Sequence, residues 1–208
     1  MRILITGGPT HEYLDPVRCL TNPSTGRMGM ALARASAKRG HSTVLVTGPT
    51  MFPDPKGVRV IRVVSALDMD RAVRREFPKC DAVIGSAAVS DYRPEEEAAS
   101  KIKKGPATMT LRLVKNPDVL GGCGERKGKR LLVGFALETD CGLENAADKM
   151  RRKHLDLVVL NGPESFGADR IGPTFLTPDG KRKAFGAMTK NRLSALIVEF
   201  VEKIGLSR

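Results

Sequence analysis

The chain contains 208 residues, of which 41% are hydrophobic and 28% are charged. This balance can bury a sizeable core, which argues against a disordered or fibrous protein, and the length predicts one domain over residues 1–208. No apolar run approaches the roughly 20 residues of a transmembrane helix, and the apolar start before Gly7 is too short for a secretory signal. We therefore expect a cytoplasmic protein without a membrane partner.

The basic balance of the chain points to an anionic partner. Lysine and arginine number 35 against 23 aspartates and glutamates, and the formal net charge is +12. Such an excess attracts nucleic acid, nucleotides, phosphorylated metabolites or acidic membranes. With two Tyr, seven Phe and no Trp, a base-stacking binder of single strands is disfavoured. The four cysteines and three histidines show no C-x-x-C or other metal-ligand spacing, so we expect neither disulfides nor a protein-built metal site.

Short apolar runs alternate with segments of helical period. The stripe of Met28, Ala31, Leu32 and Ala35, for example, predicts an amphipathic helix. In the first half we expect strands at 2–6, 43–47 and 81–88, and helices over 26–39 and from Ser65 or Asp68 to about Phe77. In the second half we expect a long polar connection over 92–108, strands at 110–114, 131–137 and 156–161, helices over 116–127, around 143–150 and over 193–204, and a hairpin at 174–185.

Strands that alternate with helices predict an α/β fold with a doubly wound, mostly parallel (Rossmann-like) sheet, helices on both faces and a small C-terminal β-hairpin. The near-continuous apolar strands agree, because such a sheet is covered on both faces. Ligands in this fold bind outside the carboxyl ends of the strands, near the point where the strand order reverses. The polar and glycine-rich residues after each strand are therefore the candidate site.

Two of these strand-end segments are candidate anion sites. Gly8 follows the first strand and lets backbone N–H groups approach a phosphate, although a simple tight turn is the alternative. Neither G-x-G-x-x-G nor G-x-x-x-x-G-K-[ST] is present. Ser24, Thr25 and Gly26 lead into the helix expected at 26–39, where its positive end and Arg27 attract an anion. The plainer alternative is that Ser24 or Thr25 only caps the helix.

Residues 15–29, DPVRCLTNPSTGRMG, resemble the D-P-V-R…N-x-S-[ST]-G-x-M-G signature of the phosphopantothenoylcysteine synthetase family. The resemblance continues in order through SAAVSDYRP (86–94), KIKK (101–104), LVKNPDVL (113–120), VGFALET (133–139) and KMRRKHLDLVVLN (149–161). These blocks cover most of the chain between about residues 2 and 190.

The resemblance implies a ligase of coenzyme A biosynthesis. Its substrates would be 4′-phosphopantothenate, L-cysteine and a nucleoside triphosphate, CTP or ATP, and it would form an acyl-nucleotide intermediate and release pyrophosphate. Mg²⁺ would be bound mainly through the nucleotide phosphates, and the protein would be a homodimer. In many bacteria a flavin-dependent decarboxylase is fused ahead of this enzyme; we expect the stand-alone synthetase without FMN, with a separate decarboxylase as an open partner.

The resemblance also implies roles for individual residues. Asn22, Arg18 and Lys101 match the catalytic set, with Asn22 at the intermediate. The nucleotide-binding set is Gly85, Ser86, Ala87, Asp91, Lys101, Pro117, Asp118, Val119, Leu120, Phe135, Lys149 and Lys153. The phosphate- or substrate-binding set is Gly8, Ser24, Thr25, Gly26 and Arg27.

Structural alternatives and departures accompany these roles. Asn22 could cap a turn, the i, i+4 pair Lys149 and Lys153 could form a solvated basic face, and Phe135 could belong to the core. Pro23 stands where the family often has His, Arg27 where it often has Lys, Leu137 where Ala is common, and Asn161-Gly162 where Asn-Asp is usual.

Two other functions remain open at this point. A nicotinamide-dependent reductase has similar topology, but the chain lacks G-x-G-x-x-G and a Tyr-x-x-x-Lys pair. The net charge would suit a nucleic-acid binder, but no nucleic-acid module is recognisable, so we expect no nucleic-acid partner.

Overall fold

A computed structural model describes residues 1–105, 107–137, 140–162, 165 and 168–206. Its largest feature is an eight-stranded sheet in the order β13-β12-β10-β9-β6-β1-β4-β5. Six of these strands are parallel. They are β1 (Arg2–Gly7), β4 (Ser42–Thr47), β5 (Val58–Arg62), β6 (Ala82–Gly85), β9 (Leu131–Leu137) and β10 (Leu157–Asn161).

The order of the parallel strands defines where a ligand can bind. The chain runs outward from β1 to β4 and β5, returns to the other side of β1, and continues through β6, β9 and β10. The direction reverses between β1 and β6, so the carboxyl ends of these two strands form the switch-point crevice of a doubly wound sheet. The predicted fold class is therefore confirmed.

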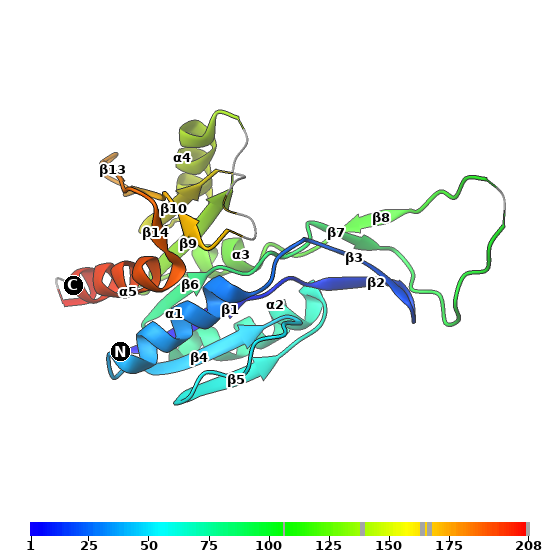
Figure 1. Cartoon of the computed structure of the whole chain (residues 1–208), viewed down its shortest axis with the longest axis horizontal. Helices are drawn as coiled ribbons and strands as arrows, with labels where there is room; N and C mark the ends of the chain where they lie inside the picture. The colour runs from blue at the N-terminus through cyan, green and yellow to red at the C-terminus, as the bar shows by residue number, and fades with distance from the viewer. Residues whose placement is uncertain (106, 138–139, 163–164, 166–167, 207–208) are drawn as a thin grey trace.

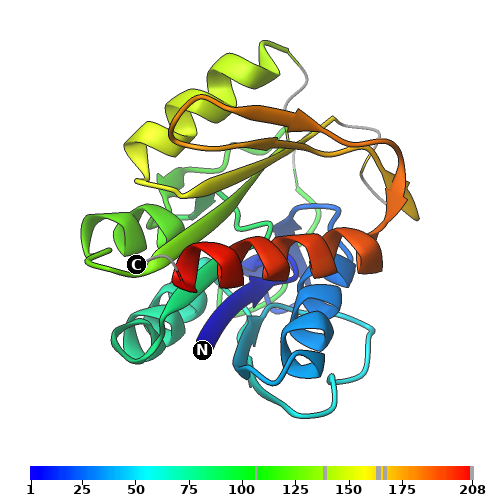
Figure 2. The same cartoon turned by 90° about the vertical axis from the view of Figure 1, so that its left-hand side faces the viewer.

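Helices cover both faces of this sheet (Figures 1 and 2). α1 (Arg27–Lys38) and α5 (Lys190–Leu206) pack against each other on one face. Their buried residues, such as Leu32 and Ile197, share a core with Ile3 and Ile5 of β1. The opposite face is covered by α2 (Ala66–Glu76), the 3-10 turn η1 (Phe77–Lys79), α3 (Val119–Glu125) and α4 (Gly142–Arg152). Leu4, between Ile3 and Ile5, faces that second core, as the period of a strand requires.

The hairpin predicted at 174–185 is confirmed, and it extends the main sheet. β12 (Thr174–Leu176) pairs antiparallel with β10, and β13 (Arg182–Ala184) pairs with β12 at the edge. The turn between them holds Gly180 at a φ of 78°, which glycine adopts at little cost. A small separate pair, β11 (Arg170–Ile171) with β14 (Met188–Thr189), leads into α5.

An arm extends away from the sheet, to the right in Figure 1. It consists of the hairpin β2 (His11–Asp15) with β3 (Arg18–Thr21) and the ribbon β7 (Tyr92–Pro94) with β8 (Leu113–Lys115). The sequence predicted none of β2, β3, β5 and β7. The strand expected at 110–114 is wrong in its bounds, because the chain pairs with β7 as a strand only from Leu113 to Lys115.

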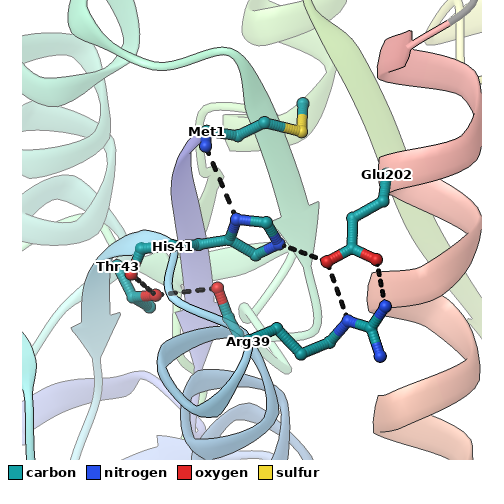
Figure 3. Close-up of polar contacts among 6 residues, drawn as sticks. Met1, Arg39, His41, Thr43 and Glu202 are labelled. Carbon is teal, nitrogen blue, oxygen red and sulfur yellow. Dashed lines mark hydrogen bonds and ion pairs between the residues drawn. The ribbon is translucent and has the colours of Figure 1, made fainter.

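A polar network fixes the C-terminal helix at the end of the sheet away from the arm (Figure 3). Arg39 Nε and His41 Nε2 each lie 2.7 Å from Glu202 Oε1, and the Met1 amine lies 3.5 Å from His41 Nδ1. Hydrogen bonding from Arg39, and more weakly from His41, holds the pKa of Glu202 below its ordinary value. The network joins α5 to the end of α1 and to the first strand.

Among the described residues, no helix has both the length and the apolar character needed to cross a bilayer.

Candidate functional site

Two adjoining hollows lie at the carboxyl edge of the sheet. The first has a volume of about 640 Å³ and lies beside β6, β9, α3 and α4. Of the predicted nucleotide-binding residues, all except Ser86 and Lys101 line it. Those that do are Gly85, Ala87, Asp91, Pro117, Asp118, Val119, Leu120, Phe135, Lys149 and Lys153. Ser86 lines the second hollow instead, and its hydroxyl donates to the carbonyl of Thr6 at 2.7 Å.

An acid–base pair stands at one wall of the first hollow. Asp118 is the N-cap of α3 and accepts from the Gly121 N–H at 2.8 Å, so Pro117 precedes the helix instead of opening it as expected. Lys153 Nζ lies 2.7 Å from Asp118 Oδ2. Burial alone would raise the pKa of Asp118, but the bonds from Lys153 and Gly121 outweigh it and lower that pKa.

Lys149 belongs to both hollows. Its Nζ donates to the Phe135 carbonyl at 2.6 Å, and both residues line the wall that the two hollows share. Phe135 also packs against the core of α1 and α5, so it is at once core and wall. Lys153 is the C-cap of α4 and not a helical residue, yet it still lines the first hollow with Lys149.

The second hollow has a volume of about 320 Å³ and carries mostly positive charge. Its charged lining residues are Arg27, Lys149 and Lys190, and no carboxylate is among the described residues that line it. The predicted phosphate-binding residues Ser24, Thr25 and Gly26 form another part of its wall. Arg27 is also paired with Asp169, which is not among the lining residues, and the positive charge of the described lining favours an anion over a cation.

The first turn of α1 faces the second hollow without a side-chain cap. Gly26 occupies the N-cap position at a φ of 79°, and no side chain caps the helix there. The alternative that Ser24 or Thr25 is the N-cap is therefore wrong, because the left-handed residue that begins the helix is Gly26. Thr25 makes only a long contact of 3.4 Å with the Arg27 N–H. Uncapped N–H groups at a helix start attract anions.

Two residues of the second hollow were missed from the sequence. Lys190 begins α5, and burial together with the nearby Arg27 lowers its pKa. Asn161 ends β10, and its buried Oδ1 has no hydrogen-bond partner among the described residues. The position of Asn161 at the carboxyl end of a predicted strand could have identified it as a site residue, whereas no local pattern identifies Lys190.

Asn22 lies at the rim of the second hollow. Its Nδ2 donates to the carbonyl of Ala88 at 3.1 Å. Ala88 and Pro23, the next residue along the chain from Asn22, both line the hollow. The amide is thus anchored beside the anion-binding wall.

Arg18 and Lys101 lie on the arm, and neither of them lines the first or the second hollow. Arg18 donates from Nε and Nη2 to Asp15 Oδ2, at 3.0 and 2.5 Å, and from Nη2 to the Ile102 carbonyl at 2.9 Å. The hydrogen bonds from Arg18 hold the pKa of the buried Asp15 well below its usual range. Arg18 thereby ties the segment with Lys101 to the hairpin β2–β3, while the Lys101 side chain is exposed.

Gly8 also lies outside both hollows. It has a φ of 74°, and an added Cβ would meet Gly48 N and O at 3.1 Å. Close packing against Gly48 therefore accounts for glycine at position 8, and the phosphate-binding role of Gly8 stays a prediction.

The described residues contain no group of three or more His, Cys, Asp or Glu side chains that could hold a metal ion. The fold and the site together define a Rossmann-like protein with a positively charged hollow at its switch point.

Comparison with known proteins assigns the family. The family model described as the DNA/pantothenate metabolism flavoprotein C-terminal domain matches residues 1–204, and the chain belongs to this family. The coenzyme A biosynthesis bifunctional protein CoaBC of Haemophilus influenzae is 40% identical over an alignment of 208 positions, which covers 98% of this chain and 52% of that protein. The chain spans about half the length of the curated relatives that it matches.

Solved structures agree on the fold. The crystal structure of the C-terminal domain of a CoaBC protein is 36% identical, has a TM-score of 0.87, and covers 100% of this chain and 96% of that one. A Cab2 mutant in complex with phosphopantothenate-cysteine has a TM-score of 0.79 at 17% identity, with 99% of this chain and 86% of that one covered. At that identity the likeness shows the fold alone.

The pair Asp118–Lys153 gives a testable pH dependence. Because the pKa of Asp118 is lowered on folding, the stability from its contacts is present above the unfolded value of about 3.9 and is lost as pH falls through the folded pKa. We predict that Lys153→Gln raises the Asp118 pKa, measured by carboxyl NMR titration. Arg151→Gln, two residues away and paired with Asp148, should leave it unchanged. An Asp118 pKa equal in both variants would contradict the assignment.

Proposed function

We propose that the chain joins 4′-phosphopantothenate to L-cysteine at the expense of a nucleoside triphosphate, as a ligase of coenzyme A biosynthesis. The observation that carries this proposal is the second hollow, which lies at an uncapped helix start and has three cations and no acid among its described lining residues. Lys149 joins it to a larger hollow. The family assignment and the CoaBC relatives support it.

The two hollows suit the two ends of a nucleotide. The first combines small residues at the strand end, Gly85 and Ala87, with the wall of Phe135, and can take a base and ribose. The second supplies the charge for the phosphates through Arg27, Lys190 and the N–H groups of α1. Lys149 lines both and so stands where the α-phosphate would join the two parts.

The first step activates the carboxylate of phosphopantothenate. A carboxylate oxygen attacks the α-phosphorus, the bond to the β-phosphate oxygen breaks, and pyrophosphate leaves with that electron pair. Negative charge gathers on the phosphates during this exchange, and fixed cations and N–H groups stabilise it without reorganisation. Lys149, Arg27 and the first turn of α1 are placed for this task.

The second step forms the amide. The cysteine amine attacks the acyl carbon of the mixed anhydride, the nucleoside monophosphate leaves, and the nitrogen loses a proton. Asn22 would contact this intermediate from the rim of the second hollow, because its amide offers donors and an acceptor without adding charge. Ser24, Thr25 and Gly26 line the same wall and would hold phosphate oxygens.

Mg²⁺ fits this arrangement if the phosphates supply most of its ligands. When bound, it would neutralise the triphosphate and the leaving pyrophosphate. Asn161 Oδ1, which has no hydrogen-bond partner among the described residues, is a polar acceptor in the second hollow and would help to hold the hydrated ion. CTP or ATP is the proposed co-substrate, and FMN, nucleic acid and a membrane have no place in the proposal.

In the proposed reaction, Arg18 and Lys101 would have to act at the site of a second chain. Both match the catalytic set, yet both lie on the arm and line neither hollow of their own chain. The arm also exposes Val17, Tyr92 and Met109, at 61%, 52% and 57% of their surface. We therefore propose a cytoplasmic homodimer in which the arm of one subunit carries Lys101 to the hollows of the other. A decarboxylation that precedes or follows this ligation would be catalysed by another domain or protein.

The proposed reaction is tested by pyrophosphate release with CTP, ATP, GTP and UTP in parallel, each with Mg²⁺, phosphopantothenate and cysteine. Release should require phosphopantothenate, and mass spectrometry should detect the amide. We predict that Asn22→Ala lowers amide formation about 100-fold or more, while the dissociation constant of the nucleotide changes less than about threefold.

Asn191→Ala is the matched control, because this exposed asparagine lies on α5 and lines neither hollow. It should retain full amide formation. Pyrophosphate release without phosphopantothenate would contradict the reaction, and unchanged amide formation by Asn22→Ala would contradict the role of that residue.

Complementation tests the proposed exchange of arms. Asn22→Ala and Lys101→Ala should each be nearly inactive alone. In a heterodimer of the two variants, one site regains both residues if Lys101 acts across the interface. Random pairing then restores about a quarter of the wild-type activity. Activity that stays at the level of the separate variants would place Lys101 in its own subunit's site.

A further inference from the structure

Lys190 lines the second hollow, and it makes no direct hydrogen bond or ion pair with the described residues. It begins α5, is half-buried, and lines the second hollow but not the first. No carboxylate or carbonyl of the described residues pairs with it directly. The acid that acts on it from nearby, Asp169, is already paired with Arg27.

This arrangement is unfavourable in the absence of a ligand. Removing a cation from water costs free energy unless an opposite charge or hydrogen bonds compensate for it. Here burial and the like charge of Arg27 both act against the ammonium, which is why the pKa of Lys190 is lowered. An anion that fills the second hollow would relieve both costs at once.

The position of Lys190 along the hollows indicates which part of the anion it meets. Lys149 lines both hollows, at the junction proposed for the α-phosphate. Lys190 lines only the second, together with Arg27 and Ser24, and so lies beyond that junction as seen from the first hollow. The phosphates that follow the α-phosphate in a nucleoside triphosphate are the β- and γ-phosphates.

We infer that Lys190 binds the β- and γ-phosphates of the nucleotide and retains the pyrophosphate formed from them. This inference rests on the proposed function and adds a residue that the sequence motifs do not contain. The phosphate of phosphopantothenate offers the same chemistry to an ammonium, so the two sources need separate measurements.

The test is calorimetric titration of the full chain with inorganic pyrophosphate and Mg²⁺, and separately with 4′-phosphopantothenate. Lys190→Gln should weaken pyrophosphate binding at least about tenfold, the usual effect of losing a hydrogen bond to a charged group. Lys190→Arg should recover part of the affinity. Phosphopantothenate binding should change less than twofold in both variants.

Lys203→Gln is the matched control, since Lys203 lies on the same helix, is 73% exposed and pairs with Glu199. It should bind pyrophosphate as the wild type does. Without a ligand, Lys190→Gln should have a thermal midpoint equal to or above that of the wild type, because the substitution removes a half-buried charge that lies near Arg27 and makes no direct ion pair with the described residues. Pyrophosphate should raise the midpoint of the wild type more than that of Lys190→Gln.

The outcomes separate this inference from the proposed function. Wild-type pyrophosphate affinity in Lys190→Gln, or a selective loss of phosphopantothenate binding, overturns the inference while amide formation by the wild type still supports the ligase. A selective loss of pyrophosphate binding supports the inference even if the wild-type chain forms no amide. A wild-type chain that binds no pyrophosphate overturns the inference directly.

Discussion

Helix α1 approaches strand β1 so closely that a Cβ added to Gly29 would lie 2.7 Å from the Cα of Gly7. A side chain at Gly29 would force the backbone to shift, and a Cβ at Gly7 would lie a tight 3.1 Å from the Gly29 Cα. The close approach brings the first turn of α1 over the carboxyl end of β1, beside Ser86 at the end of β6. The uncapped N–H groups of the helix and the switch point of the sheet therefore meet in one place, and the second hollow depends on this approach.

Charge then decides what the two hollows can hold. The first hollow mixes acids and bases, and its Lys153 is already neutralised by Asp118. The second gathers Arg27, Lys149 and Lys190 without a lining carboxylate among the described residues. Of these cations, Arg27 is already paired with Asp169, whereas Lys190 makes no direct ion pair with the described residues. A chain of phosphates would compensate the half-buried charge of Lys190 better than a neutral or cationic ligand. The same physics supports the proposed reaction, in which pyrophosphate leaves as the acyl nucleotide forms.

Local patterns predicted most of the fold but not the arm. The stripe from Met28 to Ala35 predicted α1 almost to the residue, and Ser65 caps α2 in a reciprocal capping box with Asp68. Strand β2 was missed because Glu12 and Asp15 are buried acids, and each accepts a hydrogen bond from a distant backbone group that no local pattern reveals, in addition to the bonds that Asp15 accepts from nearby Arg18. Glu12 accepts from the Ala66 N–H at 2.9 Å, and Asp15 accepts from the Ile102 N–H at 3.1 Å.

The candidate site was likewise only partly predicted from the sequence. Motif resemblance predicted residues that follow strands, and the structure brings most of them to two adjoining hollows. It could not indicate Lys190, which tertiary folding alone brings beside Arg27, nor that Arg18 and Lys101 lie away from both hollows.

The central claim is that this edge of the sheet holds the activated acyl nucleotide. Crystals grown with phosphopantothenate, Mg²⁺ and the preferred nucleoside triphosphate, but without cysteine, test it most directly. We predict electron density for the mixed anhydride, with its nucleoside in the first hollow and phosphate oxygens in the second. Well-diffracting crystals with both hollows empty, or with the nucleotide bound elsewhere, would contradict it.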